Sequence, residues 1–238
     1  MIKPILIICG EPNSIFSEII VKAFNKYKNK NLRYLGGKPL VCWPIDSSRN
    51  LPEIDRIVVS TDDKAIAKVS EKCGAEVILR APELATDKSL VIDTVRDLIP
   101  KICVEPNYRH IFLLLEPTSP FRSSKTIRSC LARIVEDGFD SVATFSQAAI
   151  NPERVWSIKN GVPTPFLKKA VPWLPRQHLK PAYELNGAVY AFIADQLPQK
   201  GVSLLFGKFA AEIINSDEVI DIDTERDLKI ANAILTAK

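Results

Sequence analysis

The chain has 238 residues, of which 46% are hydrophobic, so it is long enough for one sizeable folded domain. Its 32 basic and 28 acidic residues leave a net charge of only +4 and are spread along the chain. This distribution argues against nucleic acid or an anionic membrane as a partner. The N-terminal apolar run of about six residues is too short for a signal peptide or a membrane span. We therefore expect a soluble, cytoplasmic protein.

In chain order, short apolar runs alternate with amphipathic stretches. The predicted strands occupy residues 4–9, 56–60, 75–79, 110–115, 141–146, 187–193 and 218–223. The predicted helices occupy residues 14–28, 62–73, 89–103, 123–137 and 224–236. Continuous apolar strands alternating with amphipathic helices predict an α/β fold, with a mainly parallel sheet covered on both faces.

One region departs from this alternation. Prolines and tryptophans concentrate between Asn151 and Pro181, and the periodicity of helices and strands is lost there. We predict that residues 147–185, approximately, leave the sheet to form a dimerisation or substrate-covering segment. The whole chain, 1–238, is expected to be a single domain that starts with a strand and helix at 1–29.

The cysteines stand about thirty residues apart, their number is odd, and no Cys-x-x-Cys pair occurs. They are Cys9, Cys42, Cys73, Cys103 and Cys130. Metal sites and disulfide frameworks use closer, paired spacings, so the sequence predicts buried thiols in a reducing compartment.

Ligands of such folds bind beyond the carboxyl ends of the strands, where the sequence places several polar groups. Asp221 and Asp223 stand two residues apart at a predicted strand end, so both side chains point to one face and can hold Mg²⁺. A structural alternative is that Asp223 or Thr224 caps the last helix, with Asp227 favouring its dipole. Both can hold, because capping needs only one residue of the group.

A second polar segment is "EPTSPFR", residues 116–122. Two prolines around Thr118 and Ser119 predict a rigid turn with two hydroxyls and exposed amides, followed by Arg122. This turn suits a polar ligand. The alternative is an ordinary connection in which Ser123 caps the next helix.

Two further strand ends carry candidates. Arg80 ends a predicted strand and can pair with a phosphate or carboxylate, although many such arginines form only surface pairs. Asp87 lies at a likely helix start. Asn186 and Gly187 enter a strand, and a hairpin turn is the structural alternative for them.

Taken together and in this order, these segments resemble the acylneuraminate cytidylyltransferases. The matching segments are "KNLRYLGGKPL", "RIVVSTDDKAIAKVSEKCGAEV", "LRAPELATD", "FLLLEPTSPFR", "DSVATFS", "RQHLKPAYELNGAVYAF" and "DIDTERDLKIANAIL", from Lys30 to near the C-terminus. The resemblance implies a three-layer α/β/α nucleotidyltransferase (Rossmann-like) fold and a homodimer. It also implies transfer of CMP from CTP to a sialic-acid-like, nine-carbon 2-keto-3-deoxy sugar acid, with release of pyrophosphate.

The resemblance also implies roles for individual residues. Lys30 and Asp223 would be catalytic, and Asp221 with Asp223 would hold Mg²⁺. Asn31, Arg80 and Asp87 would lie beside the nucleotide. The residues implied on the sugar side are Glu116, Thr118, Ser119, Arg122, Arg176, Gln177 and Asn186.

The N-terminal segment departs from the family pattern. Family members carry a phosphate-binding loop of the form A-R-G-G-S-K-x-I-P-x-K-N, of which only Lys30 and Asn31 remain. The replacement, "CGEPNSIFSEIIVKAFNKYKN", resembles the G-D-P-x-x-I-x-x-E opening of 4-hydroxythreonine-4-phosphate dehydrogenase-like proteins. It has no cation between Cys9 and Lys22, so we expect the amides near Gly10 to meet the phosphates, and the activity to be impaired or altered.

Two carboxylates also depart from the family. Glu116 stands where the family has glutamine, and Glu184 stands where some members have arginine. A carboxylate cannot donate a hydrogen bond, and it would repel a nearby phosphate or sugar carboxylate. The loss of the arginine indicates a different sugar acid, or none. Two alternatives remain open. One is a non-catalytic family member that acts as a binding or regulatory partner, and the other is transfer of another nucleotide to another sugar.

Overall fold

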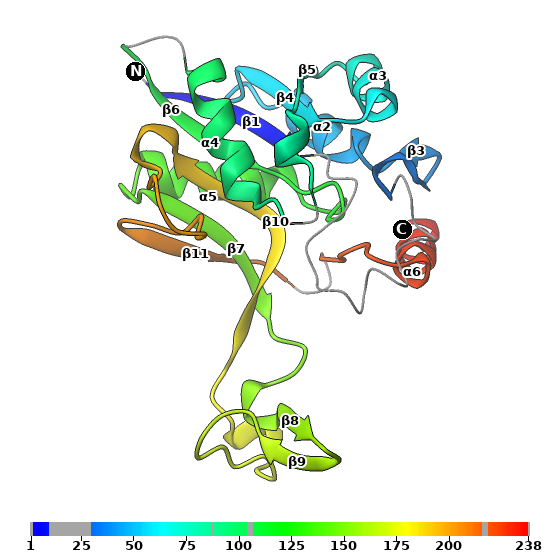
Figure 1. Cartoon of the computed structure of the whole chain (residues 1–238), viewed down its shortest axis with the longest axis vertical. Helices are drawn as coiled ribbons and strands as arrows, with labels where there is room; N and C mark the ends of the chain where they lie inside the picture. The colour runs from blue at the N-terminus through cyan, green and yellow to red at the C-terminus, as the bar shows by residue number, and fades with distance from the viewer. Residues whose placement is uncertain (1, 10–29, 87, 104–106, 216–218, 238) are drawn as a thin grey trace.

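The computed structural model of the chain describes residues 2–9, 30–86, 88–103, 107–215 and 219–237. At its centre lies a seven-stranded sheet with the strand order β11-β7-β10-β6-β1-β4-β5 (Figure 1). The strands are β1 (Ile2–Cys9), β4 (Arg56–Thr61), β5 (Glu76–Leu79), β6 (Arg109–Leu114), β7 (Ser141–Gln147), β10 (Tyr183–Ile193) and β11 (Phe209–Ile213). Only β10 runs antiparallel to its neighbours among these strands, so the predicted mainly parallel sheet is confirmed.

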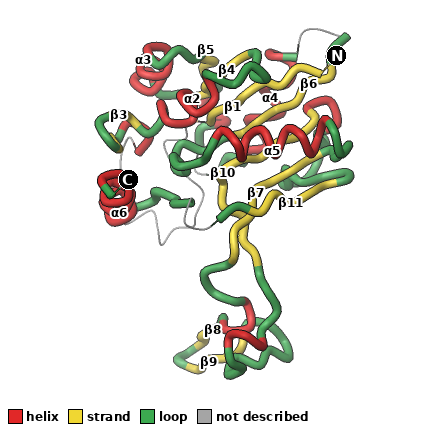
Figure 2. Tube along the Cα trace, turned by 180° about the vertical axis from the view of Figure 1, so that it is seen from behind, coloured by secondary structure: helices red, strands yellow, loops and turns green. Residues whose placement is uncertain are grey.

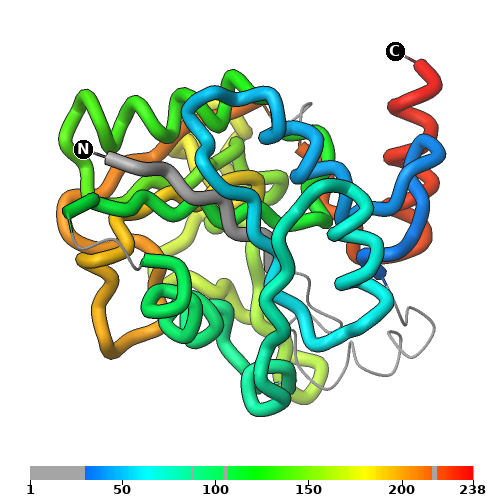
Figure 3. Tube along the Cα trace, turned by 90° about the horizontal axis from the view of Figure 1, so that it is seen from above, coloured from blue at the N-terminus to red at the C-terminus, as the bar shows by residue number. Residues whose placement is uncertain are grey.

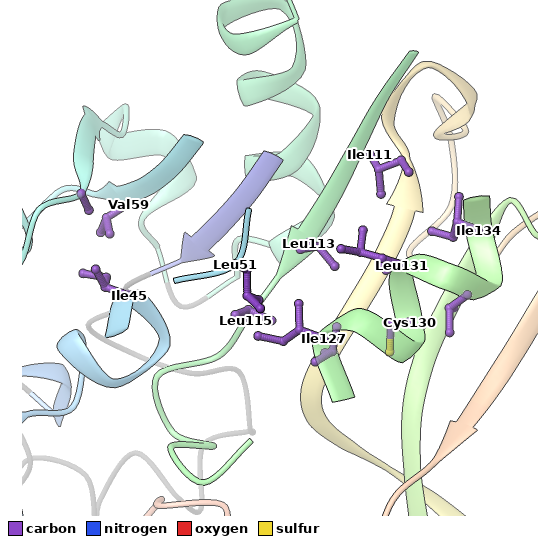
Figure 4. Close-up of a cluster of buried hydrophobic side chains, with 14 of the residues drawn as sticks. Ile45, Leu51, Val59, Ile111, Leu113, Leu115, Ile127, Cys130, Leu131 and Ile134 are labelled. Carbon is purple, nitrogen blue, oxygen red and sulfur yellow. The ribbon is translucent and has the colours of Figure 1, made fainter. Parts of the chain in front are cut away.

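Helices cover both faces of this sheet, as the sequence predicts. The helices on the sheet are α2 (Cys42–Arg49), α3 (Lys64–Lys72), α4 (Val91–Ile102) and α5 (Ser124–Val135), and a further helix, α6 (Glu225–Thr236), lies off the sheet. Successive residues of β6 point to opposite faces, so Ile111 and Leu113 pack with α2, α3 and α5, as Figure 4 shows for part of this cluster. Phe112 and Leu114 pack with α4 on the other face. The structure therefore has three layers.

The last helix lies beside a segment from the other end of the sequence. Residues Lys30–Leu32 form a short 3-10 helix, η1, and β2 (Tyr34–Leu35) pairs with β3 (Lys38–Pro39). In Figure 3, α6 in red stands next to this hairpin in blue. Leu35 of the hairpin and Ala231 of α6 are buried in one apolar cluster. This packing fixes the start of α6 next to η1.

Some predicted elements differ from the observed ones. The strand predicted at 218–223 is wrong for residues 219–223, which form no ladder; Ile222 is instead held by its N–H to the carbonyl of Thr118, at 2.9 Å, and by apolar packing. The pattern missed the half-exposed edge strand β11 and the short, polar helix α2. The helix predicted at 14–28 lies outside the described residues.

The cysteine prediction is wrong for one pair. Cys42, at the start of α2, and Cys73, at the end of α3, form a disulfide, with Cα atoms 5.9 Å apart. The two helices lie side by side on one face of the sheet, a proximity that the 31-residue separation could not reveal. Cys103 and Cys130 are free thiols, and burial raises the pKa of each to about 12.

Residues 148–182, between β7 and β10, leave the sheet and form what we call the arm (Figures 1 and 2). It contains the antiparallel pair β8 (Trp156–Lys159) and β9 (Val162–Pro165), with short 3-10 helices on either side. Large apolar side chains are exposed on it, including Trp173 at 84% and Ile158 at 73%. The excursion predicted at about 147–185 is thus present as a structural feature.

Among the described helices, none is long and apolar enough to cross a membrane.

Candidate active site

The carboxyl ends of three parallel strands meet at one edge of the sheet. In the register, Cys9 at the end of β1 pairs with Ser60 of β4, and Ile7 pairs with Leu114 at the end of β6. Ligands of open α/β sheets bind beyond this edge. The segments that follow β5 and β6 carry several of the candidates predicted from the sequence.

An ion pair joins two predicted catalytic residues that lie 193 positions apart. The Lys30 Nζ atom lies 2.8 Å from Asp223 Oδ1, and the Lys30 side chain is largely buried. Thr224, not Asp223, caps α6: its hydroxyl accepts from the Asp227 N–H in a capping box, and Asp227 Oδ2 accepts from the Asp223 N–H. The capping alternative is confirmed for Thr224, and the Asp223 carboxylate is left for the ion pair.

Asp221 stands beside this pair. Its pKa is raised, chiefly because protein atoms crowd around the carboxyl group although its surface remains exposed, and next because of the charge of Asp223. A hydrogen bond from Thr118 and the charge of Lys30 oppose the shift. Two mutually repelling carboxylates are a fitting donor set for Mg²⁺. The described residues contain no cluster of three or more metal-ligating side chains, so a bound Mg²⁺ would complete its shell with water and substrate oxygens.

The raised pKa of Asp221 leads to a prediction. The folded protein holds this proton to a higher pH than the unfolded chain, so stability falls as pH rises through the two pKa values. Because solvent screens part of the repulsion, we expect Asp221→Asn to raise Tm by only about 1–2 °C at pH 8 without metal. The same variant should lose the Tm increase that Mg²⁺ gives the wild type. Differential scanning fluorimetry with and without Mg²⁺ measures both, and a lower metal-free Tm would contradict the prediction.

Arg80 is buried beside the end of β1. Its Nη2 atom donates to the carbonyl oxygen of Ser60 at 2.8 Å, and Ser60 is the residue that pairs with Cys9. The guanidinium is thus anchored where the chain leaves β1. Asn31 is also buried, and its carbonyl accepts from the Val41 N–H at 3.0 Å. Gly10 and Asp87 lie outside the described residues.

Arg122 holds the turn after β6 against β10. It is buried, its Nε donates to the carbonyl of Ala188 at 2.6 Å, and its Nη2 donates to the carbonyl of Glu116. Burial lowers its pKa to about 9, and the charge of Glu116 opposes the shift. Ser123 caps α5 by accepting from the Thr126 N–H, which confirms that part of the alternative interpretation. Arg122 thus donates to two backbone carbonyls, and these hydrogen bonds fix the shape of the turn.

Asn186 and Gly187 lie inside β10, at an irregularity in its pairing with β7, so the hairpin-turn alternative is wrong. The Asn186 Oδ1 atom accepts from Thr144 Oγ1 at 2.7 Å and from the Ala188 N–H at 3.2 Å. Gly187 has φ +67°, and a Cβ there would come within 2.8 Å of Glu116 Oε2. The positive φ favours glycine at this position, and its lack of a side chain leaves room for the Glu116 carboxylate as it stands.

A cavity of about 770 Å³ opens at this edge of the sheet. It brings together four residues predicted from the sequence, Glu116, Arg176, Asn186 and Asp221. Its other lining residues are Ser146, Gln147, Ala148, Ala149, Glu184, Leu185, Gly187, Tyr190 and Val219. Arg176 also lines a neighbouring cavity of about 470 Å³ in the arm, and Gln177 lines only that one. Thr118, Ser119 and Arg122 are buried behind the wall of the larger cavity.

The set of predicted site residues lacks some that line the larger cavity, chiefly Ser146, Gln147 and Tyr190. Ser146 and Gln147 end the parallel strand β7, so the rule that ligands bind beyond carboxyl ends could have found them. Tyr190 lies inside an apolar strand, and nothing in its sequence context distinguishes it from a core residue.

The three layers and the charged groups at the carboxyl edge define an α/β nucleotide-binding class of fold. Among solved structures, the chain resembles a CMP:2-keto-3-deoxy-manno-octonic acid synthetase complexed with CTP, with TM-score 0.67, 13% identity and 99% of each chain covered. It also resembles 4-diphosphocytidyl-2C-methyl-D-erythritol synthase from Anaerococcus prevotii, with TM-score 0.61, 17% identity and coverage of 99% and 96%. These likenesses show the nucleotidyltransferase fold.

Sequence comparison shows the family. The family described as Cytidylyltransferase matches residues 25–171, more than half of the chain. The CMP-N,N'-diacetyllegionaminic acid synthase of Legionella pneumophila is 36% identical over 210 residues, covering 87% of this chain and 89% of the relative. The N-acylneuraminate cytidylyltransferase of Streptococcus agalactiae is 30% identical, covering 68% and 39%. The chain belongs to the acylneuraminate cytidylyltransferase family and is a nucleotidyltransferase of that type.

Proposed function

We propose that this protein transfers CMP from CTP to a sialic-acid-like, nine-carbon 2-keto-3-deoxy sugar acid and releases pyrophosphate. The observation that carries this proposal is the grouping of Lys30, Asp223 and Asp221 at the carboxyl edge of the sheet, beside a cavity large enough for a sugar acid. The names of the relatives support the choice of cytidylyl transfer and of a sugar acid as acceptor. We expect the reaction in the cytoplasm, where CTP is available.

In this reaction the anomeric hydroxyl of the sugar attacks the α-phosphorus of CTP in line, and pyrophosphate leaves as the new P–O bond forms. The protein positions the reactants and neutralises charge. Lys30 and Arg80 provide positive charge beside the phosphates. Asp221 and Asp223 would hold Mg²⁺, which neutralises phosphate charge when bound. The cavity lined by Arg176 and Asn186 receives the sugar acid.

The replaced loop changes how CTP is held. The sequence between Cys9 and Lys22 contains no lysine or arginine that could bind the phosphates. Each missing charge-assisted contact costs about 1.5–3 kcal/mol. We therefore expect a KM for CTP well above that of relatives with the arginine- and lysine-containing loop, and a nucleotide choice that must be measured.

The experiment is pyrophosphate release from CTP with Mg²⁺ and a panel of 2-keto-3-deoxy sugar acids, repeated with ATP, GTP and UTP. Sugar-dependent release of pyrophosphate with CTP supports the proposal. A preference for ATP, GTP or UTP would show that the enzyme transfers a nucleotide other than CMP. No release with any pair, together with no change of Tm on adding CTP, would contradict it. That result would favour a non-catalytic family member with a binding or regulatory role, which the absence of cations between Cys9 and Lys22 also favours.

We further propose that the protein is a homodimer formed through the arm. A monomer rarely leaves side chains such as Trp173 (84%) and Phe166 (69%) so exposed on one protruding segment. Trp173→Asp is expected to convert a dimer into a monomer in light scattering. Val202→Asp, at a residue that is 72% exposed away from the arm, is the matched control. A monomeric wild type, or a dimer unaffected by Trp173→Asp, would contradict the proposal.

A further inference from the structure

The wall of the larger cavity contains an irregular stretch of β10. The ladder between β7 and β10 is interrupted at residues 186–189, which we call the bulge, and the register places only Thr144 of β7 opposite them. A bulge disrupts the hydrogen bonds of a ladder and bends the strand, and it often redirects a side chain. Two residues of the bulge, Asn186 and Gly187, line the cavity. The shape of this wall therefore depends on what holds the bulge.

Side chains provide hydrogen bonds to the backbone of the bulge where the ladder is interrupted. The Thr144 hydroxyl accepts from the Val189 N–H at 2.9 Å. The Ser119 hydroxyl donates to the carbonyl of Asn186 at 3.3 Å. Buried backbone groups in folded proteins are nearly always paired, and at a bulge the partner must come from outside the ladder. Thr144 is therefore part of what holds the bulge in place.

The same hydroxyl also orients the side chain of Asn186. It lies 2.7 Å from Asn186 Oδ1 and 3.2 Å from the carbonyl oxygen of Val189, so its single proton is donated to the nearer Asn186 oxygen. The Ala188 N–H donates to the same Oδ1 at 3.2 Å, and because an N–H can only donate, this contact identifies which end of the amide is oxygen. Thr144 is 1% exposed, so water does not compete for its hydroxyl. Thr144 thus makes the shorter of the two contacts that orient the amide.

The orientation of this amide decides what Asn186 offers to a ligand. Its Oδ1 atom accepts from two donors, which leaves Nδ2 as the remaining hydrogen-bonding atom. Nδ2 is buried and has no hydrogen-bond partner among the described residues, whereas a buried polar atom normally has one. The hydroxyl and carboxylate oxygens of a sugar acid can accept from such an N–H. An amide turned the other way would present its oxygen, which can only accept.

We propose that Thr144 is a positioning residue for the sugar acid, because its hydroxyl holds the bulge and keeps the Asn186 amide in the orientation that donates to the ligand. This inference rests on the proposed function and identifies what keeps its acceptor site in shape. Thr144 is buried and does not line the cavity, so it acts through Asn186 and not by contact with the ligand.

The experiment compares two substitutions of Thr144 in pyrophosphate release from CTP, with the sugar acid of the panel that gives the highest kcat/KM. Thr144→Val keeps the shape of the side chain and removes the hydroxyl, whereas Thr144→Ser keeps the hydroxyl. We expect Thr144→Val to raise KM for the sugar acid about tenfold, to leave kcat and the KM for CTP within about twofold, and Thr144→Ser to stay near wild type. An unchanged KM for the sugar acid in Thr144→Val, or an equal rise in both variants, would overturn the proposal.

Ser141→Ala is the matched control for loss of stability. Ser141 also lies on β7, and its buried hydroxyl donates to the carbonyl of Phe206 and accepts from the Phe206 N–H, each at 2.8 Å. This variant therefore loses a similar pair of hydrogen bonds outside the cavity. It should lower Tm, as Thr144→Val does, and keep the KM for the sugar acid. An equal rise of KM in both variants would reveal a general effect of destabilisation and overturn the proposal.

A double-mutant cycle tests whether Thr144 acts through Asn186. In an Asn186→Ala background, Thr144→Val should change the KM for the sugar acid by less than about twofold, because the side chain that it orients is gone. Effects of the two substitutions that multiply, as they do for independent sites, would contradict the proposal.

Crystal structures of the two Thr144 variants test the positioning without any substrate. Asn186 should keep its rotamer in Thr144→Ser and leave it in Thr144→Val. If no sugar acid supports release of pyrophosphate but Asn186 is displaced in this way, the proposed function fails and the positioning of Asn186 by Thr144 stands. An unchanged Asn186 rotamer in Thr144→Val would overturn that positioning role.

Discussion

Replacing Asp223 by asparagine is expected to lower kcat for pyrophosphate release by about a hundredfold to a thousandfold, which corresponds to about 3–4 kcal/mol of lost charge stabilisation. The asparagine keeps the shape of the side chain but removes its negative charge. It therefore removes one of the two carboxylates that would hold Mg²⁺. It also leaves the buried Lys30 ammonium, which lies 2.8 Å from Asp223 Oδ1 in the wild type, without its counter-charge.

Stability must be separated from catalysis in this test. We expect Asp223→Asn to lower Tm by a few degrees because the buried Lys30 loses its partner, so kcat is measured well below the transition. Asp97→Asn, which breaks the exposed pair with Lys101 at 2.6 Å, is the matched control and should keep kcat within about twofold. A folded Asp223→Asn variant with kcat near that of wild type would remove Asp223 from the catalytic site.

The strands at the centre of the sheet could be predicted because their sequences are determined by burial. Residues Arg109–Leu114 of β6 are apolar in succession after the first two, since both faces of the strand are covered. The edge strand β11 alternates in exposure and contains Glu212, whose carboxylate pairs with Arg133 of α5. Such a strand has no continuous apolar run, so the pattern missed it.

The sequence predicts the helix caps correctly, but it does not predict the structure of residues 219–223. Thr224 and Ser123 were predicted as possible helix caps because capping depends on residues within one turn. The run at 218–223 looks like a strand because Val219, Ile220 and Ile222 are apolar. In the structure, Ile222 is buried against Leu35 and Ala231 instead of in the sheet. Burial against a helix and a hairpin gives the same apolar pattern as burial in a sheet.

Contacts between distant segments could not be predicted by periodicity at all. The pairing of Lys30 with Asp223 depends on how α6 docks on the β2–β3 hairpin, and the Cys42–Cys73 disulfide depends on how α2 lies beside α3. The resemblance to a known family indicates Lys30 and Asp223 as catalytic residues, but it does not indicate a disulfide. The resemblance implies that Arg122 binds the ligand, whereas its observed hydrogen bonds hold the backbone of the cavity wall.

That role of Arg122 gives the second large expected effect. Arg122→Met is expected to lower the free energy of unfolding by about 2–3 kcal/mol, measured by urea denaturation at pH 7. Methionine fills similar volume but leaves the carbonyl of Ala188 without its donor and deprives that of Glu116 of one. The loss is smaller than the sum of the broken bonds because the cost of burying a guanidinium, seen in its pKa of about 9, disappears with it.

The functional part of this prediction separates a wall residue from a ligand-binding one. If Arg122 acts by holding the turn after β6 against β10, Arg122→Met should raise KM for the sugar acid. Arg122→Lys should restore neither the stability nor the KM, because one ammonium cannot reproduce the fork that reaches two carbonyls. Arg128→Met, at the exposed pair with Glu53, is the control and should change stability by less than about 0.5 kcal/mol. A fully stable Arg122→Met variant with an unchanged KM for the sugar acid would show that the turn after β6 keeps its shape without this side chain.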